Sequence, residues 1–309
     1  MKVLVTGGAG FIGSHIVEHF HRKAEVRVLD NLRSGVMYNL RGLDCEFIEG
    51  SILDRTTVRR AMENVDIIFH LAALVSVPES MDNPILCNEL NCTGLIIVLE
   101  EAARAKAKKL IFSSSAAIYG DNPSIPKSES MQAAPLSPYA ITKLDGEYYC
   151  QLFSHTGRLQ TVSLRYFNVF GARQDPQSQY AAAVPIFITQ ALENMPITIY
   201  GNGEQTRDFI HVSDVAAANA YFATVSAATG VYNVAYGQSG TINDLATSVC
   251  ELTKSVSKII HVGARPGDVK HSVASVARLC SAGFVPKNNL TGGLRDTIEY
   301  YRNRQPHII

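Results

Sequence analysis

Residues 2–30, KVLVTGGAGFIGSHIVEHFHRKAEVRVLD, decide the fold of this chain. The segment begins with a short apolar run rich in β-branched residues, which predicts a buried strand, and a glycine-rich turn follows at once. Apolar side chains at Ile12, Ile16 and Phe20 then share one helical face. A second apolar run, residues 26–29, ends at Asp30. This order of strand, glycine turn, helix, strand and acid is typical of a dinucleotide-binding βαβ unit.

The three spaced glycines have separate roles in such a unit. Gly7 allows the tight turn, Gly10 leaves room for a pyrophosphate, and Gly13 lets the helix pack closely. The free N–H groups at the start of the helix then face the phosphates. Asp30 is placed to accept hydrogen bonds from the adenosine ribose, and an acid there disfavours a ribose 2′-phosphate. The predicted cofactor is therefore NAD rather than NADP.

The composition excludes several classes of protein. The chain has 309 residues, of which 46% are hydrophobic and 18% charged, and this suits one large folded domain or two that share a core. Basic and acidic residues both number 28, so no net charge favours nucleic acid or an anionic membrane. The six cysteines form no CxxC pair, and Met1 leads directly into a strand, with no room for a signal peptide. A cytoplasmic protein with reduced thiols is predicted.

Alternating strands and helices predict an α/β fold, a Rossmann-type doubly wound parallel sheet with a smaller α/β substrate-binding domain. Further strands are expected at 46–49, 66–73, 108–112 and 161–167, and an amphipathic helix at 88–106. Beyond Tyr166 the alternation is less regular, and the turn 201–203 predicts a hairpin between strands at 197–200 and from 207 onward. We therefore expect an NAD-binding domain at 1–166, with returns near 209–240, and a mainly substrate-binding domain at 167–309.

Ligands of open parallel sheets bind at the carboxyl ends of the strands. The loop at 31–35 is placed to wrap the adenosine, and the small pair Ala72-Ala73 lets a cofactor pass close to the backbone. For His70, at the same edge, we favour a structural role over a catalytic one. Besides the glycines, Asp30 and the catalytic residues named below, the residues expected to line the cofactor are Phe11, Ile12, Asn31, Ser34, Gly35, Ser51, Ile52, Leu71, Ala72, Ala73, Asn91, Ser113 and Tyr166.

Ser115, Tyr139 and Lys143 are the predicted catalytic residues. Ser137 and Pro138 suit the start of a helix, and Tyr139 and Lys143 lie four residues apart, on one face of it. A free tyrosine has a pKa of about 10, too high for a base at neutral pH. A nearby ammonium and a positive nicotinamide ring would lower that pKa, and Lys143 would also hold the nicotinamide ribose. Ser115 would bond the same substrate oxygen and shuttle its proton.

These motifs resemble the extended short-chain dehydrogenase/reductase family, and within it the UDP-sugar 4-epimerases. The likeness covers essentially the whole chain, and its most specific parts are the segments 165–171, 201–209 and 265–268. The resemblance implies that Asn168, Arg207 and Arg265 hold the diphosphate, and guanidinium groups suit phosphate oxygens. It also implies that Asp268 holds the uridine ribose and that Val184 contacts the substrate.

The resemblance also implies a mechanism. Tyr139, as phenolate, takes the proton of the sugar 4-hydroxyl while carbon 4 gives a hydride to NAD. The 4-keto sugar then turns in the pocket, and the hydride returns to its opposite face. NAD is regenerated in each cycle and should stay bound, and no metal is implied. Family members often have an aspartate against the adenine where this chain has Ser51, which weakens one adenine contact.

The residues after Ser115 distinguish an epimerase from neighbouring activities in the family. Dehydratases need an acid and a base there, and decarboxylating enzymes a glutamate, but this chain has Ala116 and Ala117. The resemblance further implies that a tyrosine a few residues after the 265–268 segment excludes an N-acetyl group. Here Ser272 stands at that position, and residues 76–80, with Ser76 and Val77, resemble those of enzymes that accept N-acetylated sugars. We therefore favour UDP-GlcNAc/UDP-GalNAc, with UDP-Glc/UDP-Gal as further substrates.

Two other functions stay open. One is a nucleotide-sugar reductase or dehydrogenase, which would consume exchangeable cofactor. The other is a non-catalytic NAD-sensing protein, which Ser115, Tyr139 and Lys143 argue against. A homodimer is expected, with the Tyr139 helix and the 88–106 helix packed across a two-fold axis.

Overall fold

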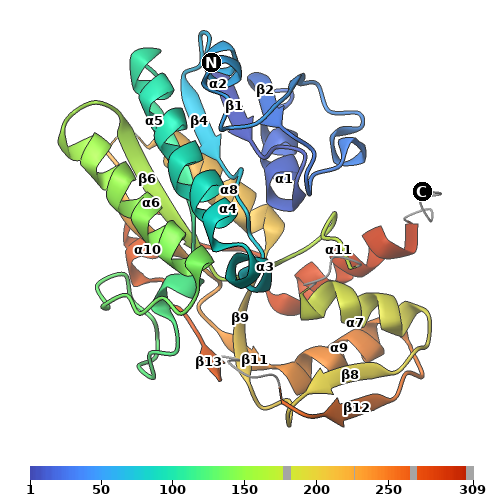
Figure 1. The fold of residues 1–309 in the computed structure, drawn as a ribbon. Coiled ribbons are helices and arrows are strands. Elements are labelled where there is room, and N and C mark those ends of the chain that lie inside the picture. The colour runs from blue at the N-terminus through green and yellow to red at the C-terminus, as the bar shows by residue number, and fades with distance from the viewer. Residues whose placement is uncertain (177–181, 226, 265–269, 304–309) are drawn as a thin grey trace.

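The computed structural model describes residues 1–176, 182–225, 227–264 and 270–303. A seven-stranded parallel sheet forms the larger half, with the strand order β10-β6-β5-β4-β1-β2-β3 (Figure 1). This confirms the predicted Rossmann-type fold. Its strands are β1 (Lys2–Thr6), β2 (Glu25–Asp30), β3 (Glu46–Glu49), β4 (Ile67–His70), β5 (Lys109–Ser115), β6 (Gln160–Tyr166) and β10 (Gly230–Val234).

Helices cover both faces of this sheet because neighbouring strand residues point to opposite sides. Val3 and Val5 pack with Phe222 in one core, and Leu4 belongs to the core on the other face. The first face is covered by α1 (Phe11–Phe20) and α8 (Val212–Thr224), and the second by α2 (Arg55–Ala61), α5 (Gly94–Arg104) and α6 (Pro138–His155). β1 stands between β2 and β4, and the strand order runs in opposite directions on its two sides. A crevice at such a switch point is where doubly wound sheets bind ligands.

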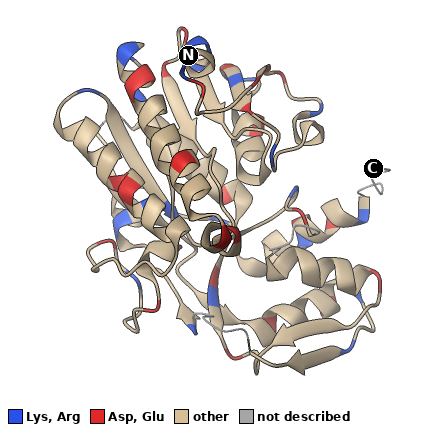
Figure 2. Cartoon of the chain, viewed as in Figure 1, with Lys and Arg blue, Asp and Glu red and all other residues tan. Residues whose placement is uncertain are grey.

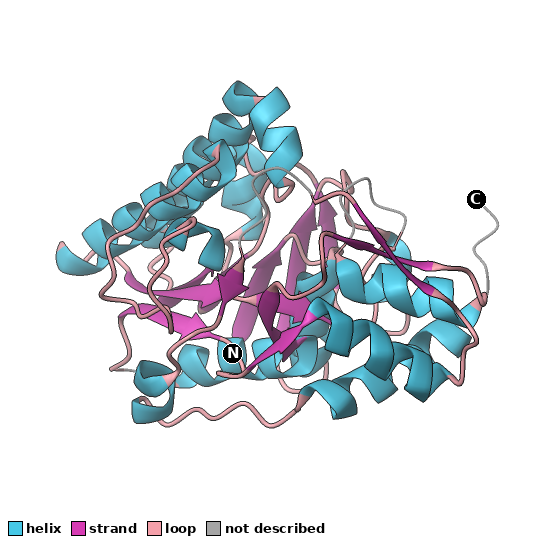
Figure 3. Cartoon of the chain, turned by 90° about the horizontal axis from the view of Figure 1, so that it is seen from below, coloured by secondary structure: helices cyan, strands magenta, loops and turns pink. Residues whose placement is uncertain are grey.

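The smaller half packs three helices against two small sheets (Figures 1 and 3). Its core contains Phe187, Ile199, Leu245 and Ile298, among others. The helices are α7 (Ala183–Leu192), α9 (Ile242–Thr253) and α11 (Leu290–Asn303), and the strands are β7 (Asn168–Phe170), β8 (Ile197–Tyr200), β9 (Thr206–His211), β11 (Ser239–Thr241), β12 (Ile259–Val262) and β13 (His271–Ser272). The chain crosses back to the large sheet at α8 and β10. The boundary drawn at residue 166 stays a prediction.

The expected hairpin around residues 201–203 is wrong. β8 pairs in parallel with β12, whereas β9 pairs with β7, β11 and β13. Gly201 and Gly203 do adopt positive φ angles of 80° and 77°, so the turn forms. The two strands leave it into different sheets because each finds a partner that is distant in sequence.

The helix expected at 88–106 is also divided. The segment begins in α4 (Pro84–Asn88), continues through a π-helical turn (Glu89–Thr93), and ends with α5, whose last residue is Arg104. Lys106 has a φ of 58°, which ends the helix. The remaining short elements are α3 (Val77–Asp82), α10 (Ala277–Ser281) and the 3-10 turns Met37–Leu40 and Ala116–Tyr119.

Charged residues of both signs are spread over both halves (Figure 2). All six cysteines are free thiols. In the described ranges, each helix is too short or too polar to cross a membrane.

Candidate active site

A cavity of about 840 Å³ runs along the carboxyl edge of the large sheet and into the smaller half. Its walls include the glycine turn, the ends of β2, β4, β5 and β6, the start of α6, and α7 and β9. The cavity is lined by most of the predicted site residues: Gly7, Gly10, Phe11, Ile12, Gly13, Asp30, Asn31, Ser34, Gly35, Ser51, Ile52, Leu71, Ala72, Ala73, Ser113, Ser115, Tyr139, Lys143, Tyr166, Asn168, Val184 and Arg207.

The glycine turn is packed too tightly for side chains. Gly7 has a φ of 72°, and a Cβ there would lie 2.7 Å from the backbone nitrogen of Ala72. A Cβ on Gly13 would lie 2.1 Å from the carbonyl oxygen of Gly7, so Gly13 allows α1 to start directly against the turn. The first-turn N–H groups of a helix have no intrahelical partners, and Phe11 and Ile12 present theirs at the cavity wall. This arrangement fits a pyrophosphate.

Asp30 is held rigidly at the end of β2. Its carboxylate accepts hydrogen bonds from the backbone N–H of Ala9 at 2.9 Å and of Leu32 at 2.9 Å. A Cβ on Gly35 would lie 3.0 Å from Asp30 Oδ2, so the loop closes tightly over the acid. A fixed carboxylate suits ribose hydroxyls and repels a phosphate, and the donor set therefore fits NAD.

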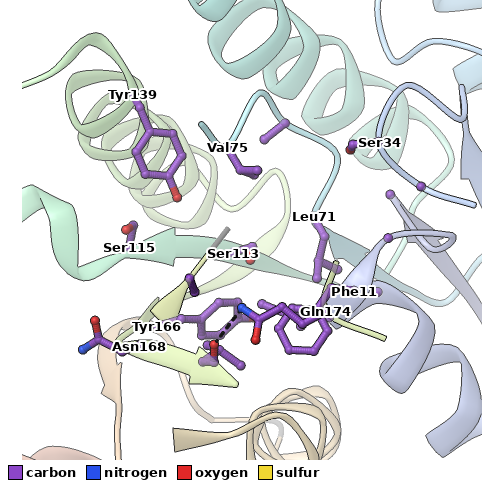
Figure 4. Close-up of a pocket in the computed structure, with 18 of the residues that line it drawn as sticks. Phe11, Ser34, Leu71, Val75, Ser113, Ser115, Tyr139, Tyr166, Asn168 and Gln174 are labelled. Carbon is purple, nitrogen blue, oxygen red and sulfur yellow. Dashed lines mark hydrogen bonds between the residues drawn. The ribbon is translucent and has the colours of Figure 1, made fainter. Parts of the chain in front are cut away.

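The three predicted catalytic residues meet at the other end of this cofactor path. Tyr139 and Ser115 face the cavity from α6 and β5 (Figure 4). Lys143 Nζ donates to the carbonyl oxygen of Ser113 at 2.8 Å and lies 5.7 Å from the centre of the Tyr139 ring. Ser137 caps α6 by accepting from the N–H of Ala140 at 3.2 Å, which confirms the predicted helix start.

In the protein without cofactor, the pKa of Tyr139 is raised, so the predicted lowering would require the bound nicotinamide as well. Burial raises the pKa of Tyr139, and a hydrogen bond with Ser115 only partly opposes this rise. Burial also lowers the pKa of Lys143 to about 8. With a pKa of about 8, Lys143 is still mainly an ammonium at neutral pH, and a buried cation 5.7 Å from the Tyr139 ring favours the phenolate. The positive charge of an oxidised nicotinamide ring would favour the phenolate further.

A network of buried polar side chains lies next to the end of the cavity that holds Ser115, Tyr139 and Lys143. Glu147, one turn beyond Lys143 on α6, accepts from Arg165 at 2.8 and 2.7 Å and from Ser114 Oγ at 2.5 Å. Arg165 also donates to the hydroxyl of Tyr119 at 2.8 Å, and that hydroxyl donates to Asn233 on β10 at 2.6 Å. All five side chains are buried. The network ties α6 to β5, β6 and β10, and so sets Tyr139 against Ser115.

Three residues expected at the cavity wall lie outside it. Asn91, in the π-helical turn, exchanges two hydrogen bonds with the backbone of Leu74, at 2.7 and 3.0 Å, and so holds the loop after β4. Ser76 caps α3 through the N–H of Glu79, and Val77 is 40% exposed on the same helix. None of these three described residues lines the cavity, and Val75 does so in their place. Short turns re-aim these side chains in a way that spacing does not predict.

The substrate end contains Asn168, Val184 and Arg207 on β7, α7 and β9. Asn168 donates to the carbonyl oxygen of Asp208 at 3.0 Å, so part of its donor capacity is used. Ser272 lies beside Arg207 in parallel register on β13, and it does not line the cavity itself. Arg265 and Asp268 lie outside the described residues.

The sequence patterns missed several cavity residues. The polar ones include Gln174 and Gln190, and the apolar ones include Val75, Phe187 and Phe209. Gln174 stands three residues after Gly171, just beyond the quoted 165–171 segment, and this proximity was an available signal. Gln190 and the preceding Thr189 are the polar residues of the otherwise apolar α7, and a polar residue in such a helix is also a signal.

His70 has the contacts of a structural residue. Its Nδ1 lies 2.8 Å from Thr6 Oγ1, and its ring stacks on Phe112. Burial lowers its pKa to about 3, so the ring is neutral at physiological pH.

Comparison with known proteins gives consistent results. The sequence profile of the NAD dependent epimerase/dehydratase family matches residues 3–235. A putative UDP-glucose 4-epimerase of Methanocaldococcus jannaschii is 33% identical over 304 residues, covering 97% of this chain and 98% of the relative. The structure of UDP-N-acetylglucosamine 4-epimerase from Methanobrevibacter ruminantium, in complex with UDP-N-acetylmuramic acid, is 41% identical, with a TM-score of 0.94 and coverage of 97% and 98%. That of Thermus thermophilus UDP-glucose 4-epimerase in complex with NAD is 37% identical, with a TM-score of 0.90 and coverage of 98% and 99%.

Proposed function

This chain belongs to the NAD dependent epimerase/dehydratase family, and we infer that it is an NAD-dependent UDP-sugar 4-epimerase, an isomerase. We propose further that it prefers UDP-GlcNAc/UDP-GalNAc and also accepts UDP-Glc/UDP-Gal. The observation that carries the reaction type is the set Ser115, Tyr139 and Lys143 at the cavity wall, beside Ala116 and Ala117. An epimerisation at carbon 4 needs one reversible proton transfer at the 4-hydroxyl oxygen and one reversible hydride transfer at carbon 4, and the two alanines supply no second acid or base.

The proposed chemistry divides between the two ends of the cavity. When bound, NAD supplies the reversible hydride acceptor that inversion at carbon 4 requires. Tyr139 removes the proton of the sugar 4-hydroxyl and later returns it, while Ser115 donates a hydrogen bond to the same oxygen. Lys143 holds the nicotinamide ribose. Arg207 and Asn168 hold the diphosphate, so the keto sugar can turn without leaving.

The preference for an N-acetylated sugar is supported by the small side chain of Ser272. β13 places Ser272 next to Arg207, so a large side chain at residue 272 would enter the space beside the diphosphate-binding arginine. A structural relative that is 41% identical is a UDP-N-acetylglucosamine 4-epimerase. From this position beside the cavity wall, a tyrosine ring would extend into the space proposed for an acetamido substituent, whereas the short side chain of Ser272 does not.

The test is to incubate the purified protein, without added cofactor, with UDP-GlcNAc and separately with UDP-Glc. Proton NMR then follows the anomeric signals. We expect the 4-epimer in both tubes, with the faster rate for UDP-GlcNAc. Ser272→Tyr should selectively lower the rate with UDP-GlcNAc, whereas Ser281→Tyr on the exposed face of α10 should change neither rate. A native rate that is no faster with UDP-GlcNAc would contradict the preference, and equal losses with both sugars in Ser272→Tyr would contradict the role of Ser272 in it.

The same experiment separates the alternative functions. A reductase or dehydrogenase would show net oxidation or reduction that matches the added cofactor in amount. An NAD-sensing protein would bind NAD and leave both sugars unchanged.

We also propose a homodimer. Apolar side chains are exposed along α6 at Ile141 (47%), Tyr148 (59%) and Leu152 (54%), and on the neighbouring α4 at Ile85 (75%). These lie on α6 and α4 rather than along α5, which refines the helices expected at the two-fold axis. Such a face is self-complementary in a two-fold dimer. Sedimentation at micromolar concentration should show a dimer for the native chain and a monomer for Tyr148→Glu/Leu152→Glu. A native monomer would contradict this assembly.

The free thiols favour a reducing compartment, and we propose the cytoplasm as the location. Detection of the native chain in a cytosolic fraction would test this.

A further inference from the structure

The turn formed by residues 171–174 joins the substrate half to the helix of the glycine fingerprint. The carbonyl oxygen of Ala172 accepts from His15 Nε2 at 2.9 Å, and Arg173 forms an ion pair with Glu18 at 3.0 Å. His15 and Glu18 are both on α1. Arg173 has a φ of 66°, so the chain reverses direction here. The turn therefore has a fixed position over the start of the cofactor path.

Gln174, at the end of this turn, directs its amide into the cavity. Its main-chain carbonyl accepts from the hydroxyl of Tyr301, and its side-chain Nε2 donates to the carbonyl oxygen of Val169 at 3.3 Å. Because a carbonyl oxygen only accepts, the amide nitrogen must face Val169. The amide oxygen Oε1 then faces the other way, buried and without a hydrogen-bond partner. Figure 4 shows this amide between Phe11 and Tyr166.

A buried amide oxygen without a partner is unfavourable, and native proteins leave few of them. A ligand that carries a donor would satisfy it. The pyrophosphate offers acceptors only, so it does not match. Phe11 begins the helix that faces the pyrophosphate, whereas Tyr166 stands at the end of the cofactor path occupied by Lys143 and Ser113. The donor expected at this second end is the N–H of the nicotinamide carboxamide.

We propose that Gln174 Oε1 accepts a hydrogen bond from the nicotinamide carboxamide and thereby fixes the rotation of that ring. The face of the ring turned to the sugar is then set by a residue of the substrate half, through a turn that is bound to α1. This assignment rests on NAD as the cofactor and is independent of which sugar is epimerised.

The test uses competition between two dinucleotides and needs no turnover. The holoenzyme is equilibrated with mixtures of NAD and 3-acetylpyridine adenine dinucleotide, in which a methyl ketone replaces the amide and the N–H donors are absent. The protein is separated and denatured, and the two bound dinucleotides are quantified. We expect the native chain to prefer NAD, and Gln174→Met to lose that preference by about 3- to 10-fold.

Two further variants make the result specific. Gln174→Glu keeps an acceptor at the same place and should keep most of the preference. Gln190→Met removes the other cavity glutamine with an unpaired buried oxygen, on α7, and should leave the preference unchanged.

The proposal is overturned if the native chain binds both dinucleotides equally, a result that no folding defect of a variant can produce. It is equally overturned if Gln174→Met keeps the native preference for NAD, or if Gln190→Met loses as much of that preference as Gln174→Met. Because no sugar is present, failure of the proposed epimerase activity would leave this binding result intact, and the two failures are distinguishable.

Discussion

At the reacting end of the cavity, Ser115, Tyr139 and Lys143 stand on a central strand and on the eighteen-residue helix α6. At the substrate end, Asn168, Arg207 and Ser272 stand on strands of three, six and two residues in the small sheets. The reacting end is cross-linked through the network of Glu147 and Arg165, whereas the described substrate end depends on short strands and backbone contacts. Proton transfer requires reacting atoms within hydrogen-bond reach, while the attraction between an arginine and a diphosphate falls off more gradually with distance. The difference teaches that each end has the stiffness its chemistry needs, and four experiments test this.

The largest effect is expected from Tyr139→Phe. Removing the hydroxyl removes the proposed base for the sugar 4-hydroxyl, and kcat should fall about 10²- to 10⁴-fold. The ring remains, so NAD content and the KM for the sugar should change little. NMR turnover assays measure kcat, and a value close to that of the native chain would exclude Tyr139 as the base.

Glu147→Leu tests the support beneath the reacting end. A buried charge left without its partner should lower the free energy of unfolding by about 3–5 kcal/mol, as measured by urea denaturation. The double variant Glu147→Leu/Arg165→Met should recover most of that loss. We expect kcat to stay low in the double variant, because the tie between α6 and β5 is still missing.

An exposed ion pair is the matched control for Glu147. Arg55 lies 2.5 Å from Glu100, with side chains that are 48% and 39% exposed. Glu100→Ala should change stability far less than Glu147→Leu, since Arg55 keeps its contact with Glu101 and water replaces the lost one. Similar losses in the two variants would refute the importance of burial.

Arg207→Leu tests the substrate end. Loss of the proposed charge-assisted hydrogen bond to the diphosphate should raise the KM about 10- to 100-fold with little change in kcat. Arg207→Lys keeps the charge but not the forked geometry, so its KM should lie between those of the native chain and Arg207→Leu. A fall in kcat with an unchanged KM would mean that Arg207 acts at the reacting end instead.

The smallest effect is expected at His70, and it depends on pH. The folded pKa of about 3 lies below the unfolded value, so only the unfolded chain binds a proton as the pH falls. Stability therefore decreases below about pH 6.5, and the loss from this group reaches about 2 kcal/mol by about pH 5. His70→Asn has no such titration, so the stability gap between native and variant chains should narrow on acidification. A gap independent of pH, in urea titrations, would contradict this account.

The sequence alone was sufficient for the parts of the protein that local pattern decides. The glycine spacing with Asp30 indicated the dinucleotide site, and the spacing of Tyr139 and Lys143 placed both on one helix face, because turns and helices are set by neighbouring residues. Tertiary structure decided the rest. It separated β8 from β9, turned Asn91 toward the backbone of Leu74, raised the pKa of Tyr139 and left Gln174 Oε1 unpaired in the cavity. Strand partners, burial and hydrogen bonding depend on residues far apart in the chain, and no local spacing contains that information.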